Sequence, residues 1–393
     1  MAAGRSGEAE VCVIGAGIMG LSAAWELSKR GIRVLCVDRA RPGGEASGAT
    51  AGTLALHNKR LGSIPLALEG VRRWRGLADE LGRDVEYERR GGFCVAHSTE
   101  DVARLEGAVE VRRALGVGIE MVYPPRLFET APYLSRDVQA ASYCADDGMA
   151  NPFLAIRAYL TACRRAGVAF ELGRNVESLD VHSDGSFTVR AAGLEVRCET
   201  VILAAGAWIP HLCRPLGIEL PLYTKIQQVM ITTPGPRLFP EIVTHVSGRL
   251  TLKQQGVTGK VVVGGGWLGE IEGGGDGRAA QATEHHLLGD SVAGNVALAL
   301  RTVPALAHTR LLRAWTGAEG RSPDRLPLVG SVGEPSRLHL LGCAAGGFTL
   351  APVCGALAAQ RVAGEESPLF SDDIRASRFL EDANTRTDTG ASQ

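Results

Sequence analysis

The sequence predicts an α/β fold built from two domains, and three observations predict it. The chain has 393 residues, 45% of them hydrophobic, and single hydrophobic cores stop growing above about 250–300 residues. A glycine-rich turn links an apolar strand to a helix in the stretch VCVIGAGIMGLSAAWELSKRGIRVLCVDR, residues 11–39. Far downstream, three runs predict strands of an antiparallel sheet: VMITTP at 229–234, RLTLKQQ at 249–255 and KVVVGGGW at 260–267.

Charge and composition exclude several classes of protein. The formal net charge is -1 and no basic run occurs, so nucleic-acid binding, which depends on clustered cations, is not expected. No segment has the roughly 18 uninterrupted apolar residues that a membrane span needs. We therefore expect a cytoplasmic protein without a membrane span, in which residues 1–8 and 380–393 are disordered.

Cysteine and histidine spacing gives no sign of a metal centre. The nine cysteines contain no CxxC pair, which predicts a reducing compartment and no zinc or iron–sulfur site. The nine histidines show no metal-binding spacing, and the adjacent His285 and His286 would point apart on a helix. No metal is expected.

The stretch 11–39 has the pattern of a Rossmann-like βαβ unit. Apolar residues at 11–14 and 34–37 predict two strands. Between them, apolar residues recur at helical spacing over 18–27, and Gly31 supplies a stop. The unit predicts a parallel sheet with a helix packed against it.

The glycines of this unit predict a dinucleotide site. Gly15 lets the chain turn, Gly17 lets a pyrophosphate approach the backbone, and Gly20 lets the helix pack closely on the strand. Asp38 ends the second strand, where a carboxylate accepts ribose hydroxyl groups. An acid there argues against a ribose 2′-phosphate. A structural βαβ unit without a ligand is the alternative.

A second run of small residues, GGEASGATAGTLA at 43–55, follows the acid directly. With this run the sequence resembles the D-amino-acid-oxidase-like flavoproteins, the family of glycine oxidase, sarcosine oxidase and amino-acid dehydrogenase beta-type subunits. The family's Ser-Gly-x-x-Ala-Gly segment is matched by Ser47, Gly48, Ala51 and Gly52. The resemblance implies that this segment contacts the diphosphate and the flavin side of FAD.

Later segments extend the resemblance over about residues 10–365. GMANPF at 148–153 leads into a helix, NVESLD at 175–180 into a strand, and VILAAGAWIP at 201–210 is a buried strand entering small residues. RAWTGAEGRSPDRLPLVG at 313–330 and LGCAAGGFTLAPVCGALAA at 341–359 match the family's closing motifs. The last helix, expected to begin near Pro352, would point its N-terminal amides at the flavin.

The resemblance implies non-covalent FAD and a set of residues that contact it. These are Gly15, Gly17, Ile18, Met19, Gly20, Asp38, Arg39, Ser47, Gly48, Ala51, Gly52, Val176, Ala205, Gly206, Trp208, Gly317, Gly346, Gly347, Phe348 and Thr349. It also implies an FAD-binding domain that is discontinuous in sequence, at 9–52, 146–220 and 311–365. The substrate-binding domain would then comprise 53–145 and 221–310, with a flexible loop at 269–280.

The sequence departs from the family at three positions. Glu319 stands where glycine oxidases carry the arginine that binds the substrate carboxylate, and Arg321 is the nearest substitute or else a solvated arginine. Glu319 would meet a substrate amine, or form an ion pair with Arg321 or Arg325. Gly317 replaces the cysteine that holds FAD covalently in monomeric sarcosine oxidases. Val262 replaces a lysine that speeds reaction with oxygen, which favours a dehydrogenase.

The chemistry has further candidate residues. His57 and Gly347 join Glu319 and Arg321 as catalytic candidates, although a lone histidine such as His57 is more often structural. On the substrate strands the candidates are Gln228, Lys253 and Trp267, and strand alternation means that half of such side chains face away.

The sequence therefore predicts an FAD-dependent oxidoreductase that takes hydride from the C–N bond of an amino acid or secondary amine, giving an imine. Glycine, sarcosine, D-proline, hydroxyproline and opines are the substrate types considered. The departures favour the catalytic beta-type subunit of a hetero-oligomeric dehydrogenase with electron-carrying partner subunits. One alternative is a stand-alone oxidase that produces hydrogen peroxide. Another is a non-catalytic flavin-binding assembly subunit. A nicotinamide dehydrogenase would leave the later motifs unexplained.

Overall fold

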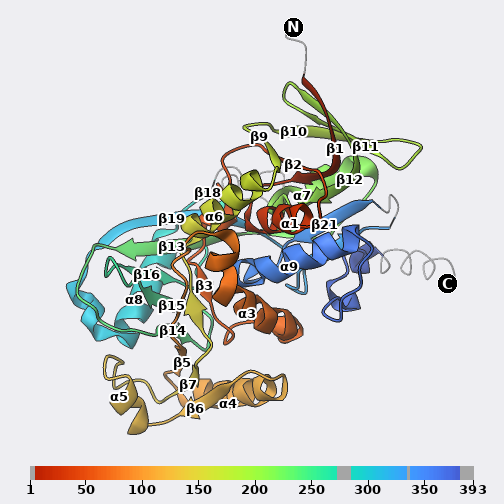
Figure 1. Cartoon of the computed structure of the whole chain (residues 1–393). Coiled ribbons are helices and arrows are strands. Elements are labelled where there is room, and N and C mark those ends of the chain that lie inside the picture. The colour runs from red at the N-terminus through yellow and green to blue at the C-terminus, as the bar shows by residue number, and fades with distance from the viewer. Residues whose placement is uncertain (1–4, 272–284, 334–336, 381–393) are drawn as a thin grey trace, which may run out of the picture.

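Two large sheets with helices packed between and around them form the protein (Figure 1). The computed structural model describes residues 5–271, 285–333 and 337–380. Figure 1 shows the first sheet at the end of the molecule near the N-terminus and the second toward the opposite end.

The first sheet is built on parallel strands in the order β9-β2-β1-β12. The far edge of the long strand β12 is shared: its first half pairs with β11 and its second half with β21. The strands are β1 (Arg5–Ile14), β2 (Val34–Asp38), β9 (Ala169–Leu172), β10 (Val176–Val181), β11 (Phe187–Ala191), β12 (Leu194–Leu203), β20 (Leu328–Ser331) and β21 (Leu338–Gly342).

Both faces of this sheet are covered, as is usual for parallel strands. Val11 and Val13 of β1 belong to one hydrophobic core and Cys12 and Ile14 to the other. The first core holds the longer helices that flank the sheet, which are α1 (Ile18–Ser28), α3 (Ile64–Leu81), α6 (Pro152–Arg165) and α9 (Gly347–Val362).

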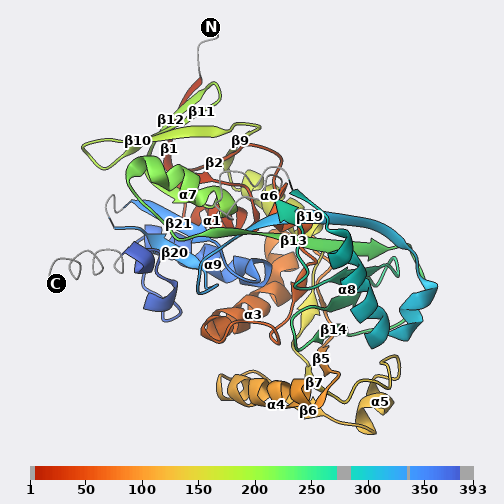
Figure 2. The same ribbon diagram turned by 180° about the vertical axis from the view of Figure 1, so that it is seen from behind.

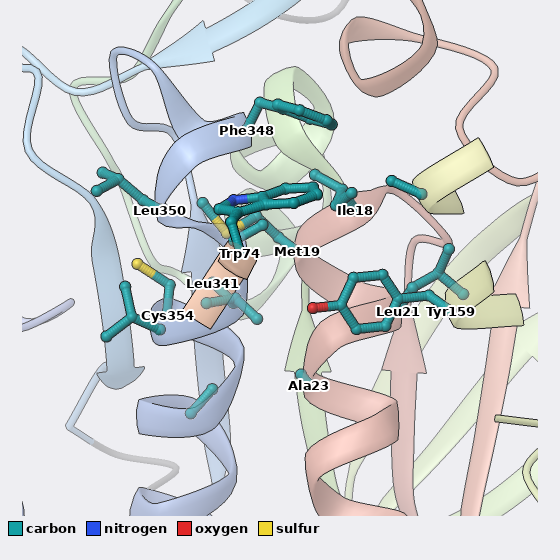
Figure 3. Packing of buried hydrophobic residues seen from close by; sticks show 14 of the residues in the cluster. Ile18, Met19, Leu21, Ala23, Trp74, Tyr159, Leu341, Phe348, Leu350 and Cys354 are labelled. Carbon is teal, nitrogen blue, oxygen red and sulfur yellow. The ribbon is translucent and has the colours of Figure 1, made fainter. Parts of the chain in front are cut away.

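Helices α1 and α9 lie side by side in this core (Figure 3). The Trp74 ring of α3 packs against Phe348 with ring centroids 4.7 Å apart, and its Nε1 donates to the Thr349 carbonyl oxygen at 3.2 Å. α3 is thereby fixed against the first turn of α9.

The second sheet has the order β19-β13-β16-β15-β14-β5-β7-β6. It is antiparallel except where β14 pairs with β5 in parallel. The strands are β5 (Gly92–Ala96), β6 (Ile119–Val122), β7 (Ala140–Cys144), β13 (Tyr223–Thr232), β14 (Ile242–His245), β15 (Thr251–Gln254), β16 (Val261–Gly264) and β19 (Leu311–Arg321).

One face of the second sheet packs on α8 (Gly289–Thr302), which Figure 2 shows from behind. The helices α4 (Thr99–Ala114) and α5 (Arg126–Thr130) lie at the far end, near β6. The remaining elements are short: α2 (Ala46–Ala49), α7 (Ile209–Cys213), the sheet of β3 (Thr53–Leu54), β8 (Gly148–Met149) and β4 (Glu88–Arg89), and the pair β17 (Glu270–Ile271) and β18 (His285–His286).

The expected α/β fold with a second, largely antiparallel sheet is confirmed, and so are the strands and helix of the βαβ unit. Four local expectations were wrong. Residues 5–8 belong to β1, paired with β12, and Leu380 packs on the second core rather than being disordered. His285 and His286 form strand β18, because they pair with β17. α9 begins at Gly347 and contains Pro352.

Two elements contact residues on the other side of the expected domain boundaries. β19 was expected with the FAD-binding residues, yet it pairs along its length with β13 of the second sheet. α3 was expected with the substrate residues, yet it packs on α9. Of the expected flexible loop and chain ends, residues 1–4, 272–280 and 381–393 lie outside the described residues.

Candidate active site

The glycine turn after β1 has the geometry of a nucleotide-binding loop. The Gly15 amide donates to the Val37 carbonyl oxygen at 2.8 Å, which joins the turn to the end of β2. Gly15 has φ +111°, and a side-chain carbon there would collide with the Ala204 carbonyl group. A side-chain carbon at Gly20 would collide with the Gly15 carbonyl oxygen. Only glycines allow the chain to turn here with α1 packed so closely.

Asp38 lies at the end of β2 beside this turn. Its Oδ2 accepts from the Ala16 amide at 2.6 Å and its Oδ1 from the Ala40 amide at 2.8 Å. Burial raises the pKa of the Asp38 carboxyl, and these two amides oppose the rise. The Arg39 guanidinium lies over the Trp208 ring, 3.7 Å from its centroid. The carboxylate and the stacked pair together form one end of a cavity.

A cavity of about 820 Å³ runs from the glycine turn to the second sheet. It is lined by most of the residues predicted to bind FAD: Gly15, Gly17, Ile18, Met19, Asp38, Arg39, Ser47, Ala51, Val176, Ala205, Gly206, Trp208, Gly317, Gly346, Gly347 and Phe348. The predicted residues Gln228, Glu319 and Arg321 also line it. Gly20, Gly48, Gly52, Thr349, His57, Lys253 and Trp267 do not.

The small-residue segment lies between α1 and β19. Ser47 Oγ accepts from the Ile18 amide at 3.0 Å, and Trp315 Nε1 donates to the Ala49 carbonyl oxygen at 2.9 Å. A side-chain carbon at Gly317 would collide with the Ala49 methyl group. Small residues are therefore required at both contacting surfaces.

Glu319 and Arg321 form an ion pair at the edge of the cavity. Arg321 Nη2 lies 2.7 Å from Glu319 Oε2, and Gln227 Nε2 donates to the same oxygen at 3.1 Å. Lys225 lies opposite Glu319 in the β13–β19 ladder. Two interactions were left open for Glu319, a contact with a substrate amine and an ion pair with Arg321 or Arg325. The structure contains the ion pair with Arg321.

Lys59 is a cavity residue that the sequence pattern did not predict. Its side chain is buried, with 9% of the residue exposed. Its Nζ packs against Gly346, the N-cap of α9, and lies 3.4 Å from the Gly346 carbonyl oxygen. Burial lowers the pKa of Lys59 to about 8, and the negative charges of Asp147 and Glu319 oppose that shift. The sequence around it, GTLALHNKR at 52–60, is polar next to Lys59 and gives no signal that this lysine is buried.

His57 is close in sequence to Lys59 but is not a cavity residue. Its Nδ1 lies 2.6 Å from Asp147 Oδ2, and the Asp147 Oδ1 accepts from the Leu56 amide at 2.7 Å. Both side chains are almost fully buried. This pair fixes the segment that carries Lys59, and the structure does not bring His57 to the cavity lining.

Lys253 and Trp267 were also expected at the substrate and lie outside the cavity lining. Lys253 Nζ lies beneath Gly52 and 3.5 Å from the Ala150 carbonyl oxygen. Trp267 packs on Gly294 of α8, with Arg249 over its ring at 5.0 Å. Thr349, expected at FAD, instead donates its hydroxyl to the Thr53 carbonyl oxygen at 3.3 Å.

These residues fit FAD. The N-cap of α1 is Gly17, which has no side chain to cap the helix, and the Ile18 amide donates to Ser47 Oγ from another segment. A helix N-terminus of this kind favours a phosphate group. Several polar atoms of cavity residues are buried without a hydrogen-bond partner in the described ranges: Thr53 Oγ1, Arg112 Nε, Arg321 Nε and the Gln228 side-chain amide. Buried polar groups without partners are uncommon in complete sites.

Neither a metal site nor a membrane span is found in the described part of the chain. No group of three or more histidine, cysteine, aspartate or glutamate residues there is arranged to hold a metal. Across the same residues, no helix combines the length and apolar character of a membrane crossing. All nine cysteines are buried and free.

Known proteins resemble the chain over most of its length. It is 25% identical over 381 residues to an opine oxidase subunit of Rhizobium meliloti, covering 93% of this chain and 96% of that protein. It is 27% identical over 379 residues to the glycine oxidase of Bacillus subtilis, covering 91% and 94%. The fold matches the crystal structure of L-proline dehydrogenase from P. horikoshii with a TM-score of 0.86 at 22% identity, covering 96% and 99%.

The family relationship agrees with the glycine turn, the small-residue segment and the closing motifs. The model of the DAO family, described as FAD dependent oxidoreductase, matches residues 10–361. The chain therefore belongs to the DAO family and is an FAD-dependent oxidoreductase.

Proposed function

We propose that the chain oxidises the C–N bond of an amino acid or secondary amine, as the catalytic beta-type subunit of a hetero-oligomeric dehydrogenase. One observation carries the substrate class: Lys59 and Glu319, of opposite charge, line the same cavity, and Lys59 lies against Gly346, the N-cap of α9. Each acts electrostatically on the other, since Glu319 favours the charged form of Lys59.

This pair of charges matches the two polar groups of an amino acid. The Lys59 ammonium attracts a carboxylate, and its burial strengthens that attraction because little water competes. The Glu319 carboxylate accepts hydrogen bonds from an amine nitrogen. A substrate held between them has its Cα–H bond fixed relative to Gly346 and Gly347 at the start of α9.

Arg321 is a positioning residue in this proposal. Its guanidinium is bonded to Glu319, and Gln227 holds the same carboxylate oxygen. These contacts fix one Glu319 oxygen and leave the other for the substrate nitrogen. Binding of the substrate carboxylate, which was considered for Arg321, is assigned to Lys59, because Glu319 already offsets the charge of Arg321.

FAD when bound supplies the hydride acceptor, the flavin N5 atom. The protein orients the amine and excludes water: the second sheet lies over the cavity, and Phe348 packs on Trp74 below it. The amine loses a hydride from Cα to that acceptor and a proton from nitrogen to the Glu319 carboxylate, giving an imine. The N-terminal amides of α9 favour negative charge beside Gly346.

Two observations support the dehydrogenase role. Val262 stands at the position where the resemblance implies an oxygen-activating lysine. The relative from Rhizobium meliloti is one subunit of an opine oxidase, which supports partner subunits that carry electrons away. The relative from Bacillus subtilis, a glycine oxidase, supports the second candidate, a stand-alone oxidase. The free cysteines are consistent with the expected cytoplasmic location.

The test is anaerobic visible absorbance of the purified FAD-loaded protein. Glycine, sarcosine, D- and L-proline, hydroxyproline and an opine are added in turn, and loss of the oxidised flavin band identifies a substrate. Air is then admitted. A band that returns slowly supports the dehydrogenase, and rapid return supports the oxidase. If no amine removes the band, the proposed function is wrong. That result is the one expected of a non-catalytic assembly subunit.

A further inference from the structure

A stacked pair of histidines lies next to the cavity lining, and the proposed function does not use either of them. His97 follows β5 and His245 ends β14. The two ring centroids are 5.1 Å apart and the ring planes meet at 19°. Both residues are buried. Burial of polar rings is costly unless their contacts offset it, so those contacts indicate what the pair does.

His245 is bonded to the turn that joins β14 to β15. The Ser247 amide donates to His245 Nδ1 at 3.1 Å, and Ser247 Oγ lies 2.7 Å from the same nitrogen. The Gly248 amide donates to the His245 carbonyl oxygen at 2.8 Å. Ser247 Oγ accepts in turn from the Arg249 amide at 3.3 Å. The His245 ring therefore holds Ser247 directly and Arg249 through Ser247.

This turn is part of the cavity wall, because residues 246–249 all line the cavity. It packs on the segment after β16: a side-chain carbon at Gly265, another lining residue, would collide with the Arg249 carbonyl group. Asn295 Nδ2 of α8 donates to the Arg249 carbonyl oxygen at 3.1 Å. One end of the turn is thus held by α8, and the other by His245.

The contact with Ser247 fixes the protonation state of the His245 ring. A backbone amide can only donate, so Nδ1 carries a lone pair and the ring proton lies on Nε2. The His245 Nε2 atom faces the Asp101 carboxylate, with Oδ2 at 3.6 Å. A proton added to Nδ1 would remove the acceptor of the Ser247 amide. The neutral ring is therefore the form that holds the turn.

The surroundings of His245 favour this neutral ring. Burial lowers the pKa of His245 from the ordinary 6.5, and the Arg301 charge of α8 and the Arg104 charge of α4 lower it further. The Asp101 carboxylate of α4 opposes the shift. Because the folded-state pKa is lowered, the stabilisation by the neutral ring is present above pH 6.5 and is lost as the pH falls through the folded-state value.

His97 adds a second reason for His245 to stay neutral. Neither ring nitrogen of His97 has a hydrogen-bond partner within the ranges that the structure describes. Burial lowers the pKa of His97 to about 4, the charges of His245 and Arg301 lower it too, and Asp137 and Asp101 oppose the shift. His97 is therefore neutral over the range in which an ordinary histidine titrates. An apolar-like neutral ring stacked on His245 gives no charge to offset a proton there.

We propose that His245 is a positioning residue for the cavity: its neutral ring holds the turn 246–249 in the wall, and protonation of the ring loosens the turn and weakens ligand binding. The inference rests on the proposed function in one respect, because it takes the cavity to be where a carboxylate ligand binds. His245→Asn keeps the contact without the titration, since an asparagine side-chain oxygen accepts from the backbone amide two residues on.

Hydrogen exchange of the Ser247 amide in the FAD-loaded protein tests the positioning, at about pH 7 and about pH 5. After correction for the intrinsic pH dependence of exchange, its protection should fall about 3- to 10-fold at the lower pH, the equivalent of about one hydrogen bond. His245→Asn should keep the protection at both pH values, and His245→Phe should lack it at both. An equal fall in His245→Asn, or no fall in the unchanged protein, would overturn the proposal.

His182→Asn is the matched control for this experiment. His182 Nε2 lies 2.8 Å from Thr188 Oγ1 in the first sheet, and His182 does not line the cavity. The control carries the same chemical change as His245→Asn, so it should lose the protection of the Ser247 amide at low pH as the unchanged protein does. A control that resembles His245→Asn would show that the turn responds to histidine removal in general, which contradicts the proposal.

A binding measurement connects the turn to the cavity. Methoxyacetate has an oxygen in place of the amine of sarcosine and is not oxidised at a C–N bond, and its affinity is read from perturbation of the oxidised flavin spectrum. Between about pH 7 and about pH 5 its dissociation constant should rise about 3- to 10-fold, and it should stay within about twofold in His245→Asn. A rise that persists in His245→Asn would assign the titration to another group, such as His211 of the lining, and overturn the coupling.

The two measurements separate this inference from the proposed function. If methoxyacetate binds at no pH, the proposed carboxylate site is wrong, and hydrogen exchange of Ser247 alone decides whether His245 positions the turn. If methoxyacetate binds with an affinity that does not change between about pH 7 and about pH 5, the carboxylate site stands and the coupling to His245 is wrong.

Discussion

Lys253 of β15 lies directly across from Val262 of β16 in the antiparallel ladder. Val262 is the position where the resemblance implies a lysine, so a lysine stands one strand away on the same face of the sheet. Lys253 does not line the cavity, and its Nζ lies against Gly52 and 3.5 Å from the Ala150 carbonyl oxygen. Burial lowers the pKa of Lys253 to about 7.

Replacing Lys253 by methionine should stabilise the protein. The folded pKa of about 7 lies below the ordinary 10.5, so the native state disfavours the charged form, and stability falls as pH decreases from about 10.5 to about 7. Lys253→Met removes this cost while keeping the shape, with an expected gain of about 1–3 kcal/mol at pH 7. Urea unfolding at pH 7 and pH 10 measures it. A loss of bound FAD in the variant would show that Lys253 contacts the cofactor after all.

Arg321 should act on the substrate only through Glu319. Arg321→Met leaves the carboxylate without its strongest partner, so KM for an amine substrate should rise about tenfold with a smaller change in kcat. Arg321→Lys keeps the charge and should restore part of the loss. Steady-state kinetics with FAD content as a control measures both. If Glu319→Gln leaves KM unchanged, neither residue serves the amine.

Binding of a carboxylate should depend on the charge of Lys59. With a pKa of about 8, the ammonium form is present below that pH and is lost above it. The dissociation constant of methoxyacetate should therefore rise about tenfold per pH unit above about pH 8. Flavin spectral titrations from about pH 6.5 to about pH 9.5, the range in which this lysine changes charge, measure the dissociation constant. Lys59→Met should bind weakly with a flat profile, and a sloping profile in that variant would assign the titration to another group.

The close packing of α1 on β1 should not tolerate a side chain at Gly20. A methyl group there meets the Gly15 carbonyl oxygen, which is backbone and moves only with the turn. Gly20→Ala should lower the FAD content, and it should lower the free energy of unfolding by about 1–3 kcal/mol. Gly107→Ala is the matched control: Gly107 is in α4, with no atom near its added methyl group. That control should gain about 0.5–1 kcal/mol. Measured FAD content and thermal unfolding decide between them, and equal behaviour would contradict the packing argument.

Local patterns predicted several residues that the structure brings together around the glycine turn. Gly15, Gly17 and Asp38 line the cavity as expected, because a GxGxxG turn between two strands is fixed by neighbours within one βαβ unit. The resemblance added Gly317 and Phe348, which come from distant segments and line the same cavity.

The cavity residues that the sequence did not predict depend on contacts between distant segments of the chain. Whether Lys59 or His57 faces the cavity depends on Asp147, which is far away in the sequence and holds His57. Arg249 lines the cavity only because the second sheet places its turn there. A strand pattern gives alternation but not which positions along one face reach a ligand. Thr251 lines the cavity, and Lys253, two residues further along β15, does not.

The shared edge of β12 has a consequence for how the chain matures. β12 cannot pair with β21 until residues 338–342 are made, near the end of synthesis. β13 likewise cannot pair with β19 until residues 311–321 are made. The parallel pair of β5 with β14 also joins segments separated by the whole of β12. A ribosome adds about 5–20 residues per second, so both sheets stay open for much of translation. Flavin capture is therefore expected only after nearly the entire polypeptide has emerged, and truncated chains should be devoid of the cofactor.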